Sequence, residues 1–400
     1  MIKKFIVLFL GIITVGFASD IKIGGLLESY HSYKINEEGE VIGNRNRARL
    51  NFRKENNNIY AQISLRAINN EIVSDKSNRI ELYEAYCQYY QTNWDLTFGR
   101  QIYNWGKADG IRIMDAISPV DYREFLTRDF DETRLPLESF KFRYMPGTSE
   151  FELVWIPKFK PARFPDSPDN PWYRPQMQDE IEPETTSPQE PELTLENSEI
   201  AVKYSAFTGG IDLSASFSYL WEDRPILSLQ NNKAVSEYHR IIMGGASLSK
   251  PIGDLVVRAE GNIIEGQYFH TNTEDLSVEK GSARYLVGID WYPGNNFTLS
   301  TQLANQQFIF DYTDQIIPDQ NNYLATINFR KEFFRQKLEL ENMLYYGFDE
   351  QDIFERLSVD YAMTDNFHLA CGIDYFWGDK GYLGAYDDND SFWLKVKYNF

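Results

Sequence analysis

The feature that most constrains this chain is a two-residue alternation of apolar and polar side chains, which recurs along most of the sequence. Successive side chains of a β-strand point to opposite faces, so this alternation predicts strands with one apolar and one polar face. The clearest example is residues 211–221, where Ile211, Leu213, Ala215, Phe217, Tyr219 and Trp221 are separated by Asp212, Ser214, Ser216 and Ser218. Many such strands in one chain predict an all-β fold, a transmembrane antiparallel up-and-down β-barrel.

The number of strands follows from counting the alternating segments. We expect about 18 strands, and the pattern is compatible with 16 to 20, since strand boundaries read from sequence carry errors of several residues. The segments lie near residues 20–33, 43–54, 58–69, 80–90, 93–102, 137–146, 150–157, 197–207, 210–221, 237–249, 253–265, 283–292, 296–310, 322–333, 335–347, 353–363, 365–376 and 390–400.

The lengths of the connections support a barrel over a soluble β-sandwich. After every second predicted strand the connection is short, as at 55–57, 91–92, 147–149, 208–209, 293–295 and 364. The connections between these are usually longer, as at 34–42, 222–236 and 267–282. Outer-membrane barrels place short turns on the periplasmic side and long loops outside, whereas a sandwich has no reason to keep this order.

The two ends of the sequence predict export and insertion. Lys3 and Lys4 precede an apolar run at 5–17, and small residues follow it, so residues 1–19 are predicted to be a signal peptide. The alternative, a single membrane anchor, is disfavoured because the run is shorter than the roughly 20 residues of a spanning helix. Residues 20–400 then form a single barrel domain. The last strand carries apolar residues up to Tyr398 and Phe400, which resembles the signal by which the barrel-assembly machinery recognises its substrates.

Composition is consistent with this fold and excludes several other classes of protein. Aromatic residues make up 15% of the chain, as expected for the girdles at both membrane interfaces. The formal net charge of −19 argues against binding of nucleic acid. The two cysteines, Cys87 and Cys371, are far apart and form no metal-binding motif, so neither a metal site nor another cofactor is predicted.

A first insertion, residues 103–136, is much longer than an ordinary connection, and long loops in compact folds are often functional. Ser118 as N-cap, Pro119 as first helical residue and Asp121 as capping carboxylate predict a short helix over 119–126. Its charge favours a segment folded into a wet lumen that narrows the channel, and the alternative is a cap on the rim. The residues that we expect to form this constriction are Trp105, Lys107, Asp109, Arg112, Asp115, Asp121, Arg123 and Arg128.

The same insertion carries a resemblance to a known family. The residues that carry the resemblance are Gly99-Arg100-Gln101, Trp105-Gly106-Lys107-Ala108-Asp109 and Ser118-Pro119-Val120-Asp121-Tyr122. With them the chain resembles porin-like outer-membrane proteins of largely unknown function, in which a Trp-Gly-x-Ala-Asp sequence follows an early strand and precedes a Pro-Asp-Tyr or similar segment. Here Val120 separates the proline from Asp-Tyr, a departure from that pattern. Members of this group are often encoded near exporters of lipids or other hydrophobic compounds. The resemblance therefore implies an inner-membrane exporter as partner and a hydrophobic cargo.

A second insertion, residues 157–196, is predicted to be a long extracellular loop. It holds nine of the 16 prolines, and because proline lacks a backbone donor, this segment cannot supply a strand ladder. Its first half is basic and aromatic and is expected to pack over the mouth of the barrel. Its second half, 178–192, is acidic.

If the apolar residues of each strand face lipid, a basic group faces the lumen. Its members are Arg45, Arg47, Arg49, Arg53, Arg66, Lys141 and Arg143, and the opposing acids are Asp212, Glu260, Asp290, Glu339, Glu341, Asp360 and Asp374. Two interpretations remain open: the basic group attracts anions, or the charges pair across the lumen and hold its shape.

About 18 strands enclose a lumen too wide for side chains alone to fill, so the leading hypothesis is a porin-like channel. It would serve passive diffusion of solutes or export with an inner-membrane partner. The alternatives are an adhesive or structural surface protein with a plugged barrel and, least favoured, an outer-membrane hydrolase, since no nucleophile and histidine form a recognisable motif. The expected location is the outer membrane of a Gram-negative bacterium, in contact with its lipids, as a monomer or a trimer.

Overall fold

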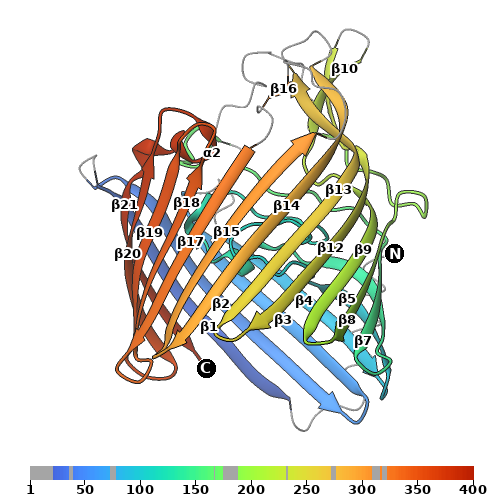
Figure 1. Ribbon diagram of the computed structural model, residues 1–400, viewed down its shortest axis with the longest axis horizontal. Coiled ribbons are helices and arrows are strands. Elements are labelled where there is room, and N and C mark those ends of the chain that lie inside the picture. The colour runs from blue at the N-terminus through green and yellow to red at the C-terminus, as the bar shows by residue number, and fades with distance from the viewer. Residues whose placement is uncertain are drawn as a thin grey trace.

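The computed structural model is a closed antiparallel β-barrel (Figure 1). It describes residues 21–35, 39–72, 78–165, 167–173, 188–230, 233–271, 276–308, 316–317 and 322–400. Within these ranges, 18 strands form the wall, as the sequence predicts. The last strand pairs antiparallel with the first, Leu26 lying opposite Asn399, and this pairing closes the sheet.

The strands agree with the predicted segments to within a few residues, except where noted below. Their bounds are β1 Lys22–Lys34, β2 Val41–Asn56, β3 Ile59–Asn70, β4 Asn78–Tyr90, β5 Trp94–Gln101, β6 Leu137–Tyr144, β7 Ser149–Ile156, β8 Glu199–Thr208, β9 Ile211–Trp221, β12 Arg240–Ile252, β13 Leu255–Thr271, β14 Ser277–Gly294, β15 Phe297–Phe308, β17 Asn322–Phe333, β18 Leu338–Gly347, β19 Ile353–Ala362, β20 Phe367–Trp377 and β21 Ser391–Asn399. Among the same residues, no helix has the length and apolarity needed to cross a membrane.

Alternation sets which side chains face the lumen. In β9 the serines Ser214, Ser216 and Ser218 are buried inside, while Leu213 and Phe217 are exposed on the outer surface. Outward apolar exposure of this kind is stable only against lipid. The connections at 57–58, 91–93, 145–148, 209–210, 253–254, 295–296, 334–337 and 363–366 are short and share one end of the barrel, which we call the turn end. The opposite end is the loop end.

Two predicted loops at the loop end contain strands instead. Residues 267–282 were expected to connect two strands, but β13 and β14 continue as a paired ribbon to His270 and Ser277. A bulge precedes this extension at Gly266, whose φ is +80° and where a Cβ would lie 2.4 Å from the backbone oxygen of Arg240. The expected loop 222–236 holds a hairpin of β10 Ile226–Gln230 and β11 Lys233–Glu237, and the two-residue β16 Ile316–Ile317 pairs with β13.

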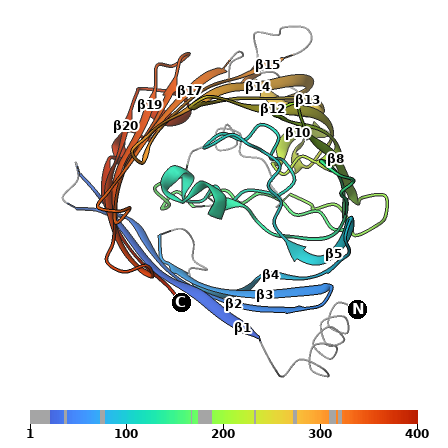
Figure 2. The same cartoon turned by 60° about the horizontal axis from the view of Figure 1, so that its bottom comes forward.

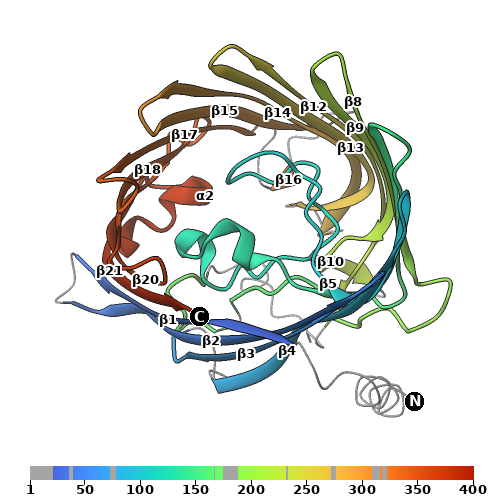
Figure 3. The same cartoon turned by 90° about the horizontal axis from the view of Figure 1, so that it is seen from below.

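The first insertion lies inside the barrel and not over its rim (Figures 2 and 3). The helix expected over 119–126 is wrong. Val120 and Asp121 are extended and form bridges with Arg134 and Arg163, and the helical turns are the 3₁₀ segments η1 Phe125–Thr127 and η2 Phe130–Thr133. Ser118 and Asp121 do not cap a helix because they have other partners. The Ser118 hydroxyl accepts a hydrogen bond from the Tyr103 N–H at 2.8 Å, and Asp121 pairs with arginines.

Other predictions lie outside the described residues. These are the signal peptide, 1–19, and most of the acidic part of the second insertion. Among the described residues, the other short helices are α2 Gly381–Gly384 and η4 Asp387–Asn389, which follow β20 and face the barrel interior (Figure 3).

Candidate functional site

The first insertion crosses the lumen from β7 to β13 and β15. At one side the Trp105 indole N–H donates to Glu152 of β7 at 2.6 Å. At the other side Glu260 of β13 accepts the backbone N–H of Lys107 and, at 3.4 Å, that of Met114. Gln302 of β15 donates to the backbone oxygen of Asp109 at 2.8 Å. The segment 105–114 is therefore held at both ends by inward-facing side chains of the wall.

An apolar cluster supports the start of this crossing. It consists of Tyr103, Trp105, Ile117, Leu137, Val154, Ile156 and Ala201. The ammonium group of Lys203 lies 5.0 Å from the Trp105 ring centroid, a cation–π distance. Gly106 packs closely here, since a Cβ would lie 3.1 Å from the Cβ of Asp115. Burial of these side chains fixes the insertion where it leaves the wall.

Buried ion pairs dock the insertion on a second part of the wall, formed by β1, β2 and β21, which we call the anchoring wall. Glu28 of β1 pairs with Arg45 at 3.4 Å and with Arg47 at 2.8 Å. The same two arginines reach the insertion, Arg45 at 2.5 Å from Glu124 and Arg47 in contact with Glu132. Glu28, Arg45, Arg47 and Glu124 are almost fully removed from water, and Glu132 is 19% exposed, so each buried charge requires its partner.

Within the insertion, two buried carboxylates collect arginines. Asp115 accepts from Arg112 at 2.6 Å and from Arg134 at 2.7 Å. Asp121 pairs with Arg123 at 2.7 Å and Arg128 at 3.2 Å, and Arg163 of the second insertion lies at 3.8 Å. Burial by itself would raise the pKa of the Asp121 carboxyl, but the three guanidinium groups outweigh it and hold this pKa well below its usual range.

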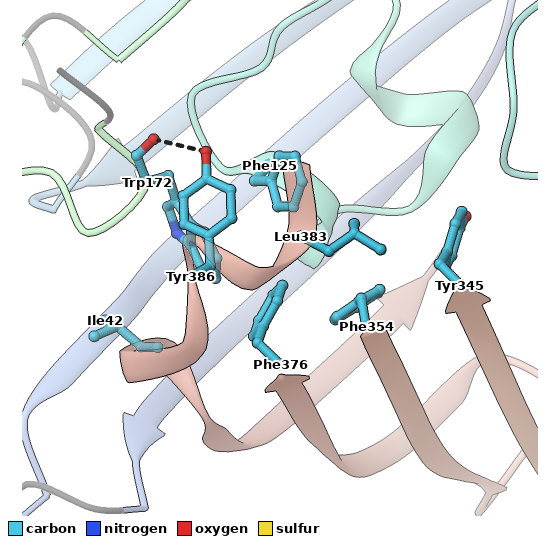
Figure 4. Close-up of a cluster of buried hydrophobic side chains, with 8 residues drawn as sticks. All are labelled: Ile42, Phe125, Trp172, Tyr345, Phe354, Phe376, Leu383 and Tyr386. Carbon is cyan, nitrogen blue, oxygen red and sulfur yellow. Dashed lines mark hydrogen bonds between the residues drawn. The ribbon is translucent and has the colours of Figure 1, made fainter. Parts of the chain in front are cut away.

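An aromatic cluster joins three segments that are distant in sequence (Figure 4). Phe125 of the first insertion stacks on Trp172 of the second, with ring centroids 6.1 Å apart. Tyr386, after α2, lies 4.5 Å from Phe125, and its hydroxyl donates to the backbone oxygen of Trp172 at 3.3 Å. The described part of the second insertion, expected over the mouth, thus packs at the loop end through a nearly fully buried Trp172, whose ring lies 5.8 Å from that of Phe376 near the end of β20.

A chamber of about 950 Å³ lies between the first insertion and the remaining wall. We call strands β14, β15, β17, β18 and β19, which face it, the chamber wall. Its inward side chains include Leu324, Met343, Tyr345 and Phe354 beside Arg356. Inward positions of this wall are mostly polar, as expected, for example Asn328, Arg330 and Glu341, and the apolar positions are exceptions. The apolar residues cluster because Phe125, Leu126 and Ile111 of the insertion pack against them.

The basic residues predicted to face the lumen divide into two groups. Arg66 pairs with Glu81 and lies 4.0 Å from the Tyr83 ring, and Arg143 lies 2.7 Å from Asp95, so these join Arg45 and Arg47 as paired cations. For Arg49, Arg53 and Lys141, no ion pair is found in the part of the chain that the structure describes. These pairs join neighbouring strands, or a strand and the first insertion, and not opposite sides of the lumen. A role of all these residues in lining the pore stays a prediction.

Two residues predicted for the constriction pair with the wall near the chamber. Lys107 lies 2.9 Å from Asp212, and Asp109 lies 2.7 Å from Arg258 of β13. Arg258, Glu28, Glu152 and Arg356 were not predicted from the sequence. Alternation offered a signal for Glu152, because Phe151 and Leu153 beside it are apolar and belong to the outward set.

Three carboxylates could in principle hold a cation. Oxygens of Glu28, Asp129 and Glu132 lie within 4.8 Å of one another, which makes them the one such group among the described residues. Each is already paired, Glu28 with Arg45, Glu132 with Arg47 and Asp129 with Lys395 at 3.3 Å. The arrangement therefore serves docking of the insertion.

Comparison with known proteins agrees with this architecture. Residues 30–295 match the family model described as "Protein of unknown function (DUF1302)", and no curated protein matches the chain. Among solved structures, Pseudomonas aeruginosa OccK8 (OprE) is similar with a TM-score of 0.59 at 9% identity, over 96% of this chain and 99% of that one. Acinetobacter baumannii OccAB3 gives 0.55 at 9% over 95% and 99%, and Pseudomonas aeruginosa OccK5 (OpdH) gives 0.56 at 12% over 96% and 99%. At these identities the likeness concerns the fold.

Proposed function

Because the chain belongs to the family described as "Protein of unknown function (DUF1302)", a description that assigns no activity, we propose from the geometry of the lumen that it is a porin-like channel of a Gram-negative outer membrane. The observation that carries the proposal is the chamber of about 950 Å³, which lies between the first insertion and the chamber wall inside a closed barrel. The lumen of an 18-stranded barrel is too wide for side chains alone to fill, so the part that the insertion leaves open can hold an aqueous path.

The proposed path passes the insertion on the side of the chamber wall. Towards β7 the insertion is sealed by the buried cluster around Trp105, and towards the anchoring wall by the ion pairs of Arg45 and Arg47. The insertion is thus a constriction fixed to one side of the lumen, and solutes move past its other side.

The cargo is a finer question with two candidates. Passive diffusion of polar solutes needs only the wet, charged parts of the chamber. Export of a hydrophobic cargo, delivered by an inner-membrane partner, is the second candidate. It is favoured by the apolar side chains of Leu324, Met343 and Tyr345 at lumen-facing positions, where barrels usually carry polar residues.

The test is single-channel conductance of the refolded protein in planar bilayers, compared with a variant in which a short Gly-Ser linker replaces 103–136. We expect steps at least about two-fold larger in the variant, because a constriction controls conductance. A matched control removes the β10–β11 hairpin, residues 226–237, which does not line the chamber, and it should leave the step size unchanged.

Three results would count against the proposal or part of it. Absence of conductance in both proteins would defeat the channel and favour a plugged barrel that acts at the surface. Equal steps with and without 103–136 would show that the insertion does not constrict the path. Larger steps after removal of the hairpin alone would place the constriction at the loop end.

A further inference from the structure

Resting on the proposed function, we infer that the chamber selects cationic solutes that carry an apolar or aromatic part. The first observation is that several ion pairs beside the chamber expose the acid and bury the cation. Side-chain exposure is 80% for Asp131 against 4% for Arg134, and 55% for Asp109 against 14% for Arg258. Asp129 is 47% exposed, and its partner Lys395 is 19% exposed. All three acids line the chamber.

Ion pairs that bury the acid and turn the cation towards the chamber add little positive charge to its surface. Arg112, Arg128 and Arg356 line the chamber with buried acid partners, but their side chains are only 14%, 6% and 18% exposed. Arg330 is the exception at 48% exposure, and it lies between Glu341 at 3.1 Å and Glu339 at 3.7 Å, so this group carries one net negative charge. Lys107 also lines the chamber at 24% exposure, and its partner Asp212 is 50% exposed. The charge that a solute meets in the chamber is therefore mainly negative.

The physical reason is the position of each charge relative to water. A buried guanidinium bonded to its carboxylate presents little field to a solute, whereas an exposed carboxylate oxygen can approach a solute cation at contact distance. A channel narrowed by an insertion brings solutes close to such oxygens, and charged groups tune selectivity where the pore is narrow.

The second observation is the apolar side of the same chamber. Leu324, Met343 and Tyr345 of the wall and Tyr382 after β20 line it together. Tyr382 is 53% exposed, with its ring 5.1 Å from that of Phe125. Aromatic faces attract organic cations and also bury apolar groups, so this lining favours a solute with both features.

For Arg45 and Arg47 of β2, this inference opposes the first of the two interpretations left open by the sequence, in which the basic group attracts anions. Arg45 and Arg47 are 5% and 3% exposed at their side chains and lie behind the docked insertion, away from the chamber. Their positive charge is neutralised by ion pairs with Glu28, Glu124 and Glu132. They hold the insertion and do not line the proposed path.

The first experiment measures the reversal potential of the reconstituted channel in a KCl gradient. We expect potassium to permeate in preference to chloride, and the double variant Asp109→Asn, Asp131→Asn to lower the permeability ratio at least about two-fold, because two exposed charges are lost where the path is narrow. The variant should fold, since Arg258 keeps Asp290 at 2.5 Å and Arg134 keeps Asp115 at 2.7 Å. The matched control is Asp365→Asn, an exposed acid in a turn-end connection.

The second experiment tests the solute class by adding organic ions to the conducting channel and counting how often each one blocks, that is interrupts, the potassium current. Phenyltrimethylammonium should interrupt it more often than benzenesulfonate, which has the same ring with opposite charge, and more often than tetramethylammonium, which lacks the ring. Tyr382→Ser should reduce the difference between the two ammonium ions and leave the potassium preference unchanged. Equal interruption by all three probes would overturn the inference about the ring.

Failure of this inference can be told apart from failure of the proposed function. A protein that conducts nothing defeats the channel itself. A protein that conducts with chloride preference, or whose potassium preference is the same in the double variant and in Asp365→Asn, remains a channel but has no acidic selectivity in this chamber.

Discussion

The anchoring wall and the chamber wall are built from the same kind of strand, yet the first insertion meets them in different ways. At the anchoring wall Arg45 and Arg47 bind carboxylates on both β1 and the insertion, and all these groups are nearly or largely buried. At the chamber wall Met343 and Glu341 face an open volume. The comparison teaches that paired charges fix the position of a long segment in a lumen, and that the unfilled volume lies on the side away from these pairs.

The largest effect is expected when the anchoring wall loses a shared carboxylate. Glu28→Gln removes the group that contacts both Arg45 and Arg47, and breaking a buried ion pair costs about 3 kcal/mol or more. The measurement is the free energy of unfolding by urea in lipid vesicles, together with current noise in bilayers, which should rise as the insertion loosens.

The matched variant for this prediction is Glu341→Gln on the chamber wall. Its side chain is 27% exposed and its pair with Arg330 is partly hydrated, so the change in unfolding free energy should stay within about 0.5 kcal/mol. Equal losses of unfolding free energy in the two variants would contradict the claim that ion pairs stabilise the anchoring wall more than the chamber wall.

An intermediate effect is expected at the start of the crossing. Trp105→Phe keeps most of the apolar volume but removes the donor to the buried Glu152 carboxylate, and a buried acceptor left without its partner costs about 1–3 kcal/mol. Trp155→Phe, also on β7 but on its outer face, is the control. A loss as large in the control would assign the effect to the barrel wall and not to the contact with the insertion.

The smallest effect is a change with pH at the Asp121 centre. The neighbouring arginines lower the pKa of Asp121 in the folded protein below its usual value of 3.8. The ionised carboxylate therefore contributes its full stabilisation above pH 3.8, and this stabilisation is lost only as the pH falls through the lower folded pKa. The difference in unfolding free energy between wild type and Asp121→Asn should therefore be constant from pH 8 to pH 5. A difference that shrinks within this window would contradict the shift.

Most of the wall could be predicted from the sequence, because alternation is a property of each strand by itself. Ser214, Ser216 and Ser218 of β9 face inward as their spacing predicts. The exceptions are informative: β13 and β14 extend past the predicted ends at the loop end, where a bulge at Gly266 resets the register and pairing continues to His270. A bulge of this kind interrupts the pattern that marks a strand.

The candidate site was predicted in part. Arg45 and Arg47 were assigned to the lumen because of their spacing, but their partners Glu124 and Glu132 belong to a segment with no periodic pattern. The helix expected from Ser118, Pro119 and Asp121 failed since a local capping signal competes with tertiary contacts. Asp121 instead pairs with Arg123 and Arg128, which are near in sequence, and with Arg163 of the second insertion. Val120 and Asp121 also form the bridges with Arg134 and Arg163 that keep this stretch extended.

By itself, the sequence determined that this chain closes into a barrel of about 18 strands, with one face of each strand suited to lipid. Only the tertiary structure decided that the first insertion lies inside, which wall it docks on and which carboxylates remain exposed. The physical reason is range. Strand alternation acts between neighbouring residues, whereas the pair of Arg45 with Glu124 spans 79 positions and the contact of Lys107 with Glu260 spans 153. Such pairs depend on a closed barrel that places the insertion against distant strands.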